Sequence, residues 1–238
     1  MPARPRVRAV LFDLGGTLVD DRAFGAFADL ARRVQLDLDP EAIAHAYLEV
    51  ERAHDARPPA GDRTARRIEF WRATLSLAAE RPVPAEVAHR FHRLLAETEF
   101  PLPLFSDVRR CLEALRRQGR RLAVVSNATS EARARRILDA ARIVDYFDQV
   151  TSSGTEGVAK PDPAIFHRTL ARLDVPPSAA LHVGDLEHTD ARAAIAAGLR
   201  GLWLNRFGTG FGTDPPEITS LLEVAPWLHR LERGPPQP

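Results

Sequence analysis

The first hydrophobic segment of the chain is short and ends in a polar loop. Residues 7–12 are mostly apolar, and Asp13 and the pair Gly15-Gly16 follow them closely. An apolar run that stops at a carboxylate and two glycines is typical of a buried strand that ends in a tight turn. The pattern therefore predicts a strand over 7–12, with Asp13 at its carboxyl end.

Between about Asp21 and Glu99 the apolar residues recur every three or four positions, which is the spacing of amphipathic helices. Examples of this spacing are Phe24-Phe27-Leu30, Ile43-Tyr47-Val50 and Ile68-Trp71-Leu75. The segment Pro58-Pro59-Ala60-Gly61 interrupts the pattern, and no strand-like alternation occurs in this region. We therefore expect an all-helical insertion of about four helices.

After Pro103, helical and strand-like patterns alternate along the chain. Helices are predicted over 106–118, 131–141, 163–173 and 189–197, and strands over 122–125, 149–151, 180–183 and 201–204. Ser106 is the expected N-cap of the first helix, and Gly119 and Gly198 are expected to end the first and the last. The alternation predicts an α/β fold, a doubly wound parallel sheet with its binding site at the carboxyl ends of the strands. The proline-rich segment 234–238 is predicted to be disordered.

Polar side chains follow the strands that this topology places at the centre of the sheet. They are Asp13, Ser126 with Asn127, Lys160, Asp185 after Gly184, and Asp190. Because parallel strands end at the same edge of a sheet, these groups are expected to converge. Clustered carboxylates repel one another unless a cation neutralises them, and an all-oxygen site suits Mg²⁺. A carboxylate can attack a phosphoryl group, and a hydroxyl, a lysine and the amides of the glycine turn could hold its oxygens.

Composition narrows the classes of function. The chain has 238 residues, of which 45% are hydrophobic, and its net charge of +1 gives no electrostatic footprint for nucleic acid. The single cysteine, Cys111, excludes an intramolecular disulfide and a thiolate zinc site, and its apolar neighbours place it in the core. The N-terminus lacks the apolar core of a signal peptide, and no apolar run is long enough to span a bilayer. We therefore expect a cytoplasmic protein with no membrane partner.

Lys160 is the only lysine, and the other 32 of the 33 basic residues are arginines. Biased codon usage replaces Lys by Arg wherever only a positive charge is needed. An ammonium group is a compact point donor, whereas a guanidinium group is a broad fork. A single lysine could persist by chance, but its place among the candidate site residues favours a role that arginine cannot fill.

Together these residues make the sequence resemble a haloacid dehalogenase-superfamily hydrolase with a helical cap inserted after the first strand. Four motifs match in order, namely the Asp13 loop, Ser126, Lys160-Pro161, and Gly184-Asp185 followed by Asp190. The resemblance implies a Rossmann-like catalytic core over 1–17 and 101–238, with a helical cap domain over 18–100. Such a cap would close over the site and select the substrate.

The resemblance also implies a role for each matched side chain. Asp13 would be the nucleophile, Ser126 would hydrogen-bond the phosphoryl group, and Lys160 would balance the negative charge. The expected substrate-binding residues are Gly16, Thr17 and Asn127, although Asn127 could instead orient its loop.

The resemblance implies a metal site as well. Mg²⁺ would be held by Asp13, by the backbone carbonyl of Gly15 and by Asp185, with Asp190 supporting the site from behind. The function implied is a Mg²⁺-dependent phosphatase that acts on a small phosphorylated metabolite through an aspartyl-phosphate on Asp13.

Gly15 departs from the family pattern. Phosphatases of this family usually carry a second Asp at this position, as general acid and then base, and a positioned acid typically contributes ~10²–10⁴-fold. Without it, we expect a preference for esters whose leaving group departs with little protonation, such as aryl, acyl or anomeric sugar phosphates. His188 lies close by in the sequence and could replace the missing acid, although a lone histidine is more often structural or exposed.

Two alternatives to the phosphatase remain open. Gly15 is compatible with a 2-haloacid dehalogenase, because halide leaves without a proton, but the segment Gly184–Asp190 has the metal-binding form of the phosphatases. A fold that lost its acid could also bind a phosphorylated ligand without turning it over. The motifs favour the phosphatase.

The helical insertion offers weaker candidates for substrate contacts, which are Arg63, Arg66, Arg67, His54, Arg57 and Phe24. Arginines can bind an anionic substrate, but these are also consistent with a solvated helix face. Trp71 could be buried within the insertion or against a second subunit, so both a monomer and a homodimer are expected states.

Overall fold

The computed structural model describes residues 6–56, 62–98, 100, 102–206 and 214–233. Contacts divide the chain into two compact units, Met1–Asp21 with Pro103–Pro238, and Arg22–Leu102. Residues 18–21, which the sequence analysis assigned to the helical insertion, lie in the first unit because Val19 forms bridges with Gly15 and Leu104. The Asp20 N–H also donates to the Pro103 carbonyl over 2.8 Å. The terminal segment 234–238, predicted to be disordered, lies outside the described residues.

The first unit, referred to below as the α/β unit, is built on a parallel sheet of six strands in the order β3-β2-β1-β4-β5-β6. The strands are β1 (Ala9–Phe12), β2 (Arg121–Ser126), β3 (Gln149–Ser152), β4 (Ala180–Gly184), β5 (Arg200–Leu204) and β6 (Glu217–Ile218). At the end of β1, Phe12 pairs with Val124 of β2 and with Val183 of β4. The carboxyl ends of β2, β1 and β4 therefore lie side by side, and the sheet confirms the predicted α/β fold.

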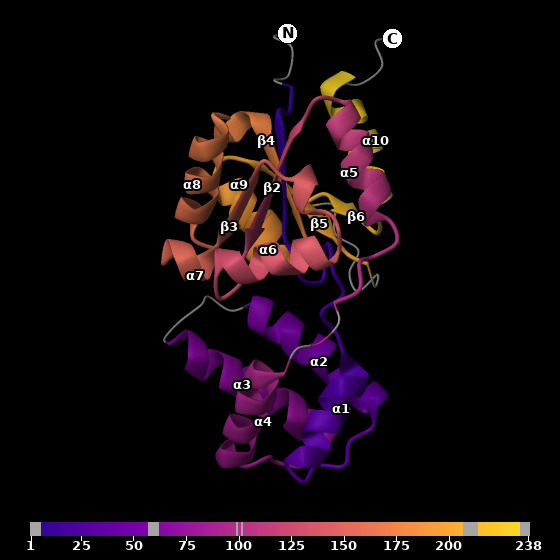
Figure 1. Cartoon of the computed structure of the whole chain (residues 1–238), viewed down its shortest axis with the longest axis vertical. Coiled ribbons are helices and arrows are strands. Elements are labelled where there is room, and N and C mark those ends of the chain that lie inside the picture. The colour runs from indigo at the N-terminus through magenta and orange to yellow at the C-terminus, as the bar shows by residue number, and fades with distance from the viewer. Residues whose placement is uncertain (1–5, 57–61, 99, 101, 207–213, 234–238) are drawn as a thin grey trace. The chain divides into compact units, whose positions relative to one another are not determined.

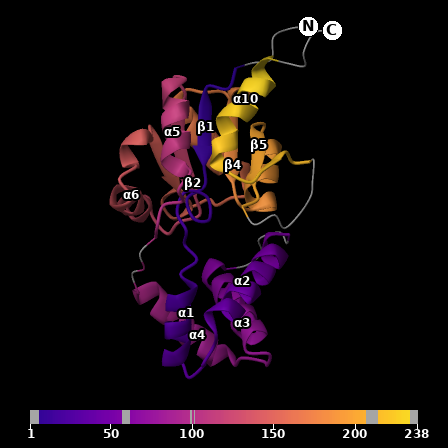
Figure 2. The same ribbon diagram turned by 90° about the vertical axis from the view of Figure 1, so that its right-hand side faces the viewer.

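Helices cover both faces of this sheet (Figures 1 and 2). The helices α5 (Val108–Arg117) and α10 (Val224–Arg233) lie together on one face, while α8 (Pro163–Leu173) and α9 (Ala193–Ala196) lie on the other. The shorter α7 (Ser153–Glu156) follows β3, and α6 (Glu131–Ala140) connects β2 to β3. Side chains of a strand alternate between faces, and Ala9 and Leu11 of β1 accordingly pack with Phe166 of α8 in one buried cluster. Cys111 of α5 is buried as predicted.

Three local predictions differ from the structure. Ser106 is not the N-cap of α5; Asp107 occupies that position, and its side chain makes no capping bond because it is engaged elsewhere. The helix predicted over 189–197 is a π-helical turn, Glu187–Arg192, followed by the short α9. Within that turn the Leu186 N–H donates to the Asp190 carboxylate over 3.1 Å, which keeps Asp190 turned towards the sheet. The elements α7, β6 and α10 were not predicted from the sequence.

The second unit consists of α1 (Phe24–Arg33), α2 (Pro40–Asp55), α3 (Arg63–Ala78) and α4 (Ala85–Glu97). The side chains of Asp39 and Asp62 cap α2 and α3. The core is aromatic, and Trp71 is only 1% exposed because Phe27, Phe70 and Phe91 surround its ring. Trp71 is therefore buried inside this helical unit.

The weaker candidates in the helical unit have local roles or lie outside the described residues. Phe24 packs edge-on against Phe27 and Tyr47. The His54 ring lies 5.4 Å from that of Phe70, and Arg67 lies over the Phe70 ring. Arg66 is half-buried. Arg57 and the side chain of Arg63 are outside the described part of the chain.

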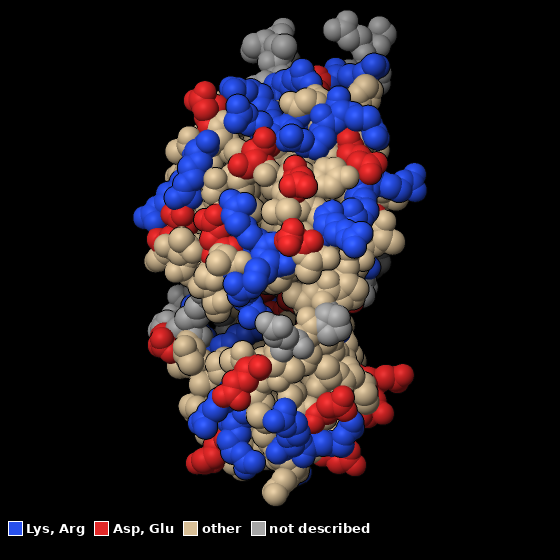
Figure 3. All heavy atoms as spheres, viewed as in Figure 1, with Lys and Arg blue, Asp and Glu red and all other residues tan. Residues whose placement is uncertain are grey.

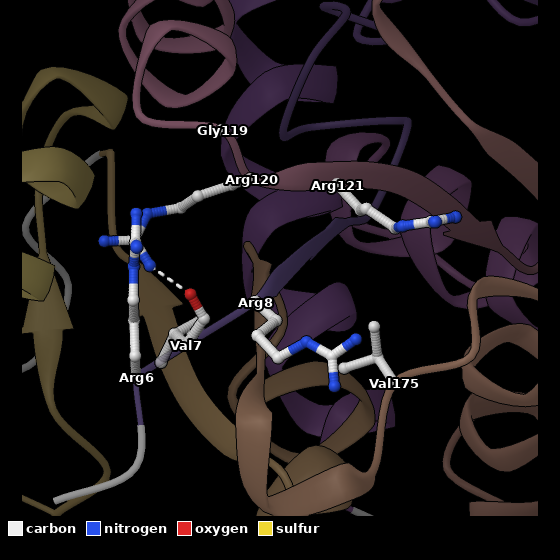
Figure 4. A pocket seen from close by; sticks show the side chains of 7 residues that line it. All are labelled: Arg6, Val7, Arg8, Gly119, Arg120, Arg121 and Val175. Carbon is white, nitrogen blue, oxygen red and sulfur yellow. Dashed lines mark hydrogen bonds between the residues drawn. The ribbon is translucent and has the colours of Figure 1, made fainter.

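Arginine side chains gather at the upper end of the α/β unit in the view of Figure 3. Figure 4 shows Arg6, Arg8, Arg120 and Arg121 around a pocket at this end, with Arg120 donating to the Val7 carbonyl. Arg120 is buried and also donates to both carboxylate oxygens of Glu232 in α10, over 2.9 and 3.1 Å. This ion pair joins α10 to the residues just before β1 and β2. No described helix is both long and apolar enough to cross a membrane.

Replacing Glu232 by Gln is expected to lower the free energy of unfolding by about 1–3 kcal/mol at neutral pH, because it removes charge-assisted hydrogen bonds. Partial burial opposes ionisation of Glu232, but hydrogen bonds from Arg120 and from the Val7 N–H hold its pKa below the usual value. A lowered pKa stabilises the fold above the unfolded-state value, and this contribution is lost as the pH falls through the folded-state value. Urea unfolding from pH 7 to pH 3 should therefore show the two proteins converging in acid.

The matched control is Glu113→Gln. Its ion pair with Arg117 spans 3.7 Å and is exposed. Such pairs contribute about 0–1 kcal/mol. A loss at Glu232 no larger than the loss at Glu113 would show that α10 does not depend on the buried pair.

Candidate active site

Three carboxylates meet at the carboxyl end of the central strands. Oxygen atoms from Asp13, Asp185 and Asp190 all lie within 4.8 Å of one another. Asp13 directly follows β1, and its N–H donates to the Val183 carbonyl of β4 over 3.0 Å, so the sheet itself fixes the position of this residue. The sequence-predicted acidic residues thus come together although as many as 177 positions separate them along the chain.

Lys160 joins two of these carboxylates. Its ammonium group donates to Asp13 and, over 2.5 Å, to Asp190, and its side chain is only 2% exposed. Asn127 holds the backbone of Lys160 from both sides, since its amide donates to the Lys160 carbonyl and its oxygen accepts from the Lys160 N–H. These two bonds support the loop-orienting alternative for Asn127.

Asp190 is held by further donors. Nε2 of His182, in the middle of β4, lies 2.9 Å from Oδ1 of Asp190, the same oxygen that accepts from Lys160. The Leu186 N–H donates to the other oxygen. His182 is fully buried and was not predicted as a site residue. The one feature of the sequence that could have pointed to it is that a histidine interrupts the otherwise apolar strand β4.

Burial and neighbouring charge shift the pKa of each group in this cluster. Burial raises the pKa of Asp13 to about 7, with a further increase from the Asp190 charge and an opposing decrease from Lys160. Burial opposes the charge on Lys160, but the two carboxylates outweigh it and raise its pKa. Burial likewise opposes ionisation of Asp190, yet Lys160 and His182 bring its pKa below the usual range. The cluster is therefore held with Lys160 charged and Asp190 ionised.

Gly16 and Thr17 lie against Asp185. The Thr17 hydroxyl donates to Asp185 Oδ1 over 3.2 Å, and the indole N–H of Trp203 donates to the Asp185 carbonyl over 3.0 Å. Gly16 has a φ of +69°, and a Cβ there would come within 2.6 Å of Asp185 Cγ. Both the conformation and the space thus require glycine at this position. Glycine at position 16 leaves room for the Asp185 carboxylate next to the backbone.

An ion pair that the sequence analysis missed holds the loop after β1. Arg206 donates through both terminal nitrogens to the two oxygens of Asp107, over 2.8 and 3.0 Å, and also to the Thr17 carbonyl over 2.8 Å. Burial opposes ionisation of Asp107, but hydrogen bonds from Arg206, Leu221 and Ser220 keep its pKa below the usual value. Because Thr17 contacts Asp185, Arg206 positions one of the three clustered carboxylates through Thr17.

Ser126 ends β2, where it pairs with Ser152 of β3, and is 7% exposed. It does not cap the following helix, because Ser130 is the N-cap of α6. His188 is exposed on the π-helical turn. Gly15 is half-buried in the loop after Asp13.

The donor set fits the metal that the sequence predicts. The three clustered carboxylates supply only oxygen, and one buried lysine neutralises only part of their charge. Mg²⁺ prefers oxygen ligands and is commonly held by one or two carboxylates together with water and phosphate oxygens. Because both oxygens of Asp190 already accept hydrogen bonds, Asp13 and Asp185 are the better candidates for direct ligands.

Comparisons with known proteins identify the family of this chain and several of its relatives. A family model for haloacid dehalogenase-like hydrolases matches residues 7–198. The chain is 31% identical over 232 residues to a phosphoserine phosphatase of Thermus thermophilus, covering 92% of this chain and 89% of the relative. It is 26% identical to the rat N-acylneuraminate-9-phosphatase, covering 95% and 96%.

Solved structures share the fold. A HAD hydrolase from Bacillus subtilis bound to magnesium superimposes with a TM-score of 0.71 at 22% identity, covering 94% of this chain and all of that one. The L-2-haloacid dehalogenase RSc1362 superimposes with a TM-score of 0.65 at 20% identity, covering 94% and all of that chain. Because both kinds of enzyme share the architecture, the fold alone does not select the reaction.

Proposed function

Because the chain belongs to the haloacid dehalogenase-like hydrolases, we propose that it is a Mg²⁺-dependent phosphatase that hydrolyses a small phosphorylated metabolite through an aspartyl-phosphate on Asp13. The relatives that match nearly the whole chain are phosphatases, which supports hydrolysis of a phosphoric monoester. The observation that carries the proposal is the meeting of Asp13, Asp185 and Asp190 around Lys160 at the ends of β1 and β4.

In the proposed reaction an Asp13 oxygen attacks phosphorus, and the bond from phosphorus to the ester oxygen breaks. Water then attacks the aspartyl-phosphate, phosphate departs, and the Asp13 carboxylate is restored. Lys160 holds the Asp13 carboxylate in place and offsets negative charge, and Asn127 fixes the loop that carries Lys160. Ser126, Gly16 and Thr17 would line the phosphoryl position at the same strand ends.

The proposed Mg²⁺ ligands are Asp13, Asp185 and the Gly15 carbonyl. Asp190 supports the site by accepting a hydrogen bond from Lys160. Bound Mg²⁺ would supply positive charge against the phosphoryl oxygens as negative charge develops on them. The three clustered carboxylates favour this function over a 2-haloacid dehalogenase, which needs no cation. We assign the reaction to the α/β unit, and a cap role for residues 18–100 stays a prediction.

The first experiment is hydrolysis of p-nitrophenyl phosphate by the purified protein with Mg²⁺ and with EDTA. We expect activity that requires Mg²⁺, since the aryl leaving group departs with little need of an acid. Halide release from a 2-haloacid in the presence of EDTA would instead identify a dehalogenase. Thermal stabilisation by a phosphate ester without release of product would identify a binding protein.

A further inference from the structure

The carboxylate of Asp21, six positions further along the chain, fills the space beside Gly15. A Cβ built on Gly15 would overlap the carboxylate of Asp21, with Asp21 Cγ 2.9 Å away. The Asp21 side chain therefore lies where the side chain of residue 15 would extend. The sequence lacks an acidic residue at position 15, but the structure places one in that space.

The loop that follows β1 brings Asp21 back to this point. The Leu18 and Val19 N–H groups both donate to the Leu14 carbonyl, over 2.9 and 3.0 Å, and the Gly16 N–H donates to the Val19 carbonyl over 2.9 Å. The Asp20 N–H then donates to the Pro103 carbonyl. This tight turn returns residue 21 to the neighbourhood of residue 15, within the same α/β unit.

The surroundings of Asp21 differ from those of the buried carboxylates. Asp13 and Asp190 are both tied to Lys160, whereas Asp21 is exposed. An exposed carboxylate can exchange protons with water, and one that lies beside the nucleophile's loop can reach a departing ester oxygen. Asp21 thus lies beside the loop that carries the nucleophile and is open to solvent.

Resting on the proposed function, we propose that Asp21 is a further catalytic residue and performs the proton transfers that Gly15 cannot. Protonated Asp21 donates its proton to the ester oxygen as the bond from phosphorus to that oxygen breaks. The Asp21 carboxylate then accepts a proton from water as the water oxygen bonds to phosphorus and the bond from phosphorus to Asp13 breaks. Asp21 is protonated again at the end of the cycle, so no other reactant is needed.

This assignment widens the class of substrates. Gly15 alone predicts a preference for leaving groups that depart unprotonated, such as aryl, acyl or anomeric phosphates. With Asp21 as the acid, esters of ordinary alcohols become substrates, because their poor leaving oxygen is protonated as it departs.

The test is Asp21→Asn, measured with phenyl phosphate and p-nitrophenyl phosphate in Mg²⁺. These esters have similar shapes, but phenolate needs a proton more than p-nitrophenolate does. We expect kcat/KM for phenyl phosphate to fall about 10²-fold or more and kcat/KM for p-nitrophenyl phosphate to change by less than about 3-fold. For p-nitrophenyl phosphate, kcat should fall after a burst of nitrophenol, because the second proton transfer is also lost.

Two further variants separate catalysis from structure. In the double variant Gly15→Asp/Asp21→Ala, the carboxylate that fills this space comes from residue 15 and not from residue 21. This variant should restore kcat/KM for phenyl phosphate. Asp20→Asn makes the same change of charge one position earlier, and should leave the ratio of the two kcat/KM values unchanged.

The outcomes separate this inference from the function on which it rests. An inactive wild type in Mg²⁺ would overturn both. An active wild type, with Asp21→Asn reducing kcat/KM equally for both esters or for neither, would overturn the role of Asp21 alone.

Discussion

Asp13→Asn is expected to reduce kcat for p-nitrophenyl phosphate by about 10³-fold or more while the protein stays folded. Asparagine keeps the shape of the side chain but removes the attacking carboxylate, and loss of a nucleophile is among the largest single effects in enzymes. Asp13 lies at the end of the central strand, in contact with Lys160 and with other carboxylates nearby. Single-turnover and steady-state rates in Mg²⁺ measure the loss.

Although Asp13→Asn should lower the activity, it should not lower the stability of the folded protein at basic pH. Burial raises the pKa of Asp13 to about 7, so the folded protein binds this proton more tightly than the unfolded chain does. Stability from such a group is present at low pH and is lost as the pH rises from the unfolded value towards the folded one. In EDTA, Asp13→Asn should therefore be at least as stable as the wild type at pH 8, and this advantage should disappear towards pH 4.

Asp139→Asn is the control for both measurements, since Asp139 is exposed on α6. It should retain the activity and the pH dependence of the wild type. Asp13→Asn with more than a tenth of the wild-type kcat would exclude the aspartyl-phosphate. A variant less stable than the wild type at pH 8 would show that the ionised Asp13 stabilises the cluster.

Sequence periodicity predicted the elements whose apolar pattern is strong. The helix over 163–173 matches α8 at both ends, and the strand over 180–183 differs from β4 by one residue. The start of α8 is also marked by a residue type that favours a helix start, since Pro163 lies in its first turn. The strand β6 has only two residues, which is too short for any alternation to be recognised. The turn at 187–192 is not a regular helix, and in it Asp190 accepts a hydrogen bond from the Leu186 N–H, a contact that periodicity does not encode.

The candidate site was predictable where its residues directly follow strands, because the topology alone brings such positions together. This holds for Asp13 and Asp185, which directly follow β1 and β4, and for Ser126, which is the last residue of β2. Asp21 and Arg206 were missed for a physical reason. Arg206 meets Thr17 across 189 positions, and Asp21 reaches Gly15 only through the turn that follows β1. Contacts of this kind depend on the tertiary path of a loop, so no spacing rule reveals them.

Lys160→Met is expected to lower the free energy of unfolding by about 3–5 kcal/mol in EDTA and to remove most of the phosphatase activity. Breaking a buried ion pair leaves charge without compensation in a medium of low polarity. Here one ammonium, 2% exposed, contacts two carboxylates, so its removal leaves Asp13 and Asp190 facing each other. Asp13 would then be protonated more readily and would be a weaker nucleophile.

Lys160→Arg tests whether position 160, which holds the only lysine of the chain, requires an ammonium group or only a positive charge. The guanidinium group is larger and presents its donors as a planar fork, whereas the ammonium group donates from a single nitrogen to Asp13 and Asp190. Because the side chain is enclosed, we expect Arg to restore less than half of the stability lost in Lys160→Met. Chemical unfolding in EDTA and kcat in Mg²⁺ measure the two effects.

Arg72→Met is the matched control, because Arg72 forms an exposed ion pair with Glu69 and should change the free energy of unfolding little. If Lys160→Arg were as stable and as active as the wild type, a positive charge of any shape would suffice at this position. The single lysine among 33 basic residues would then reflect chance. If Arg fails while Arg72→Met is neutral, the point contact of one nitrogen with two carboxylates is what the site requires.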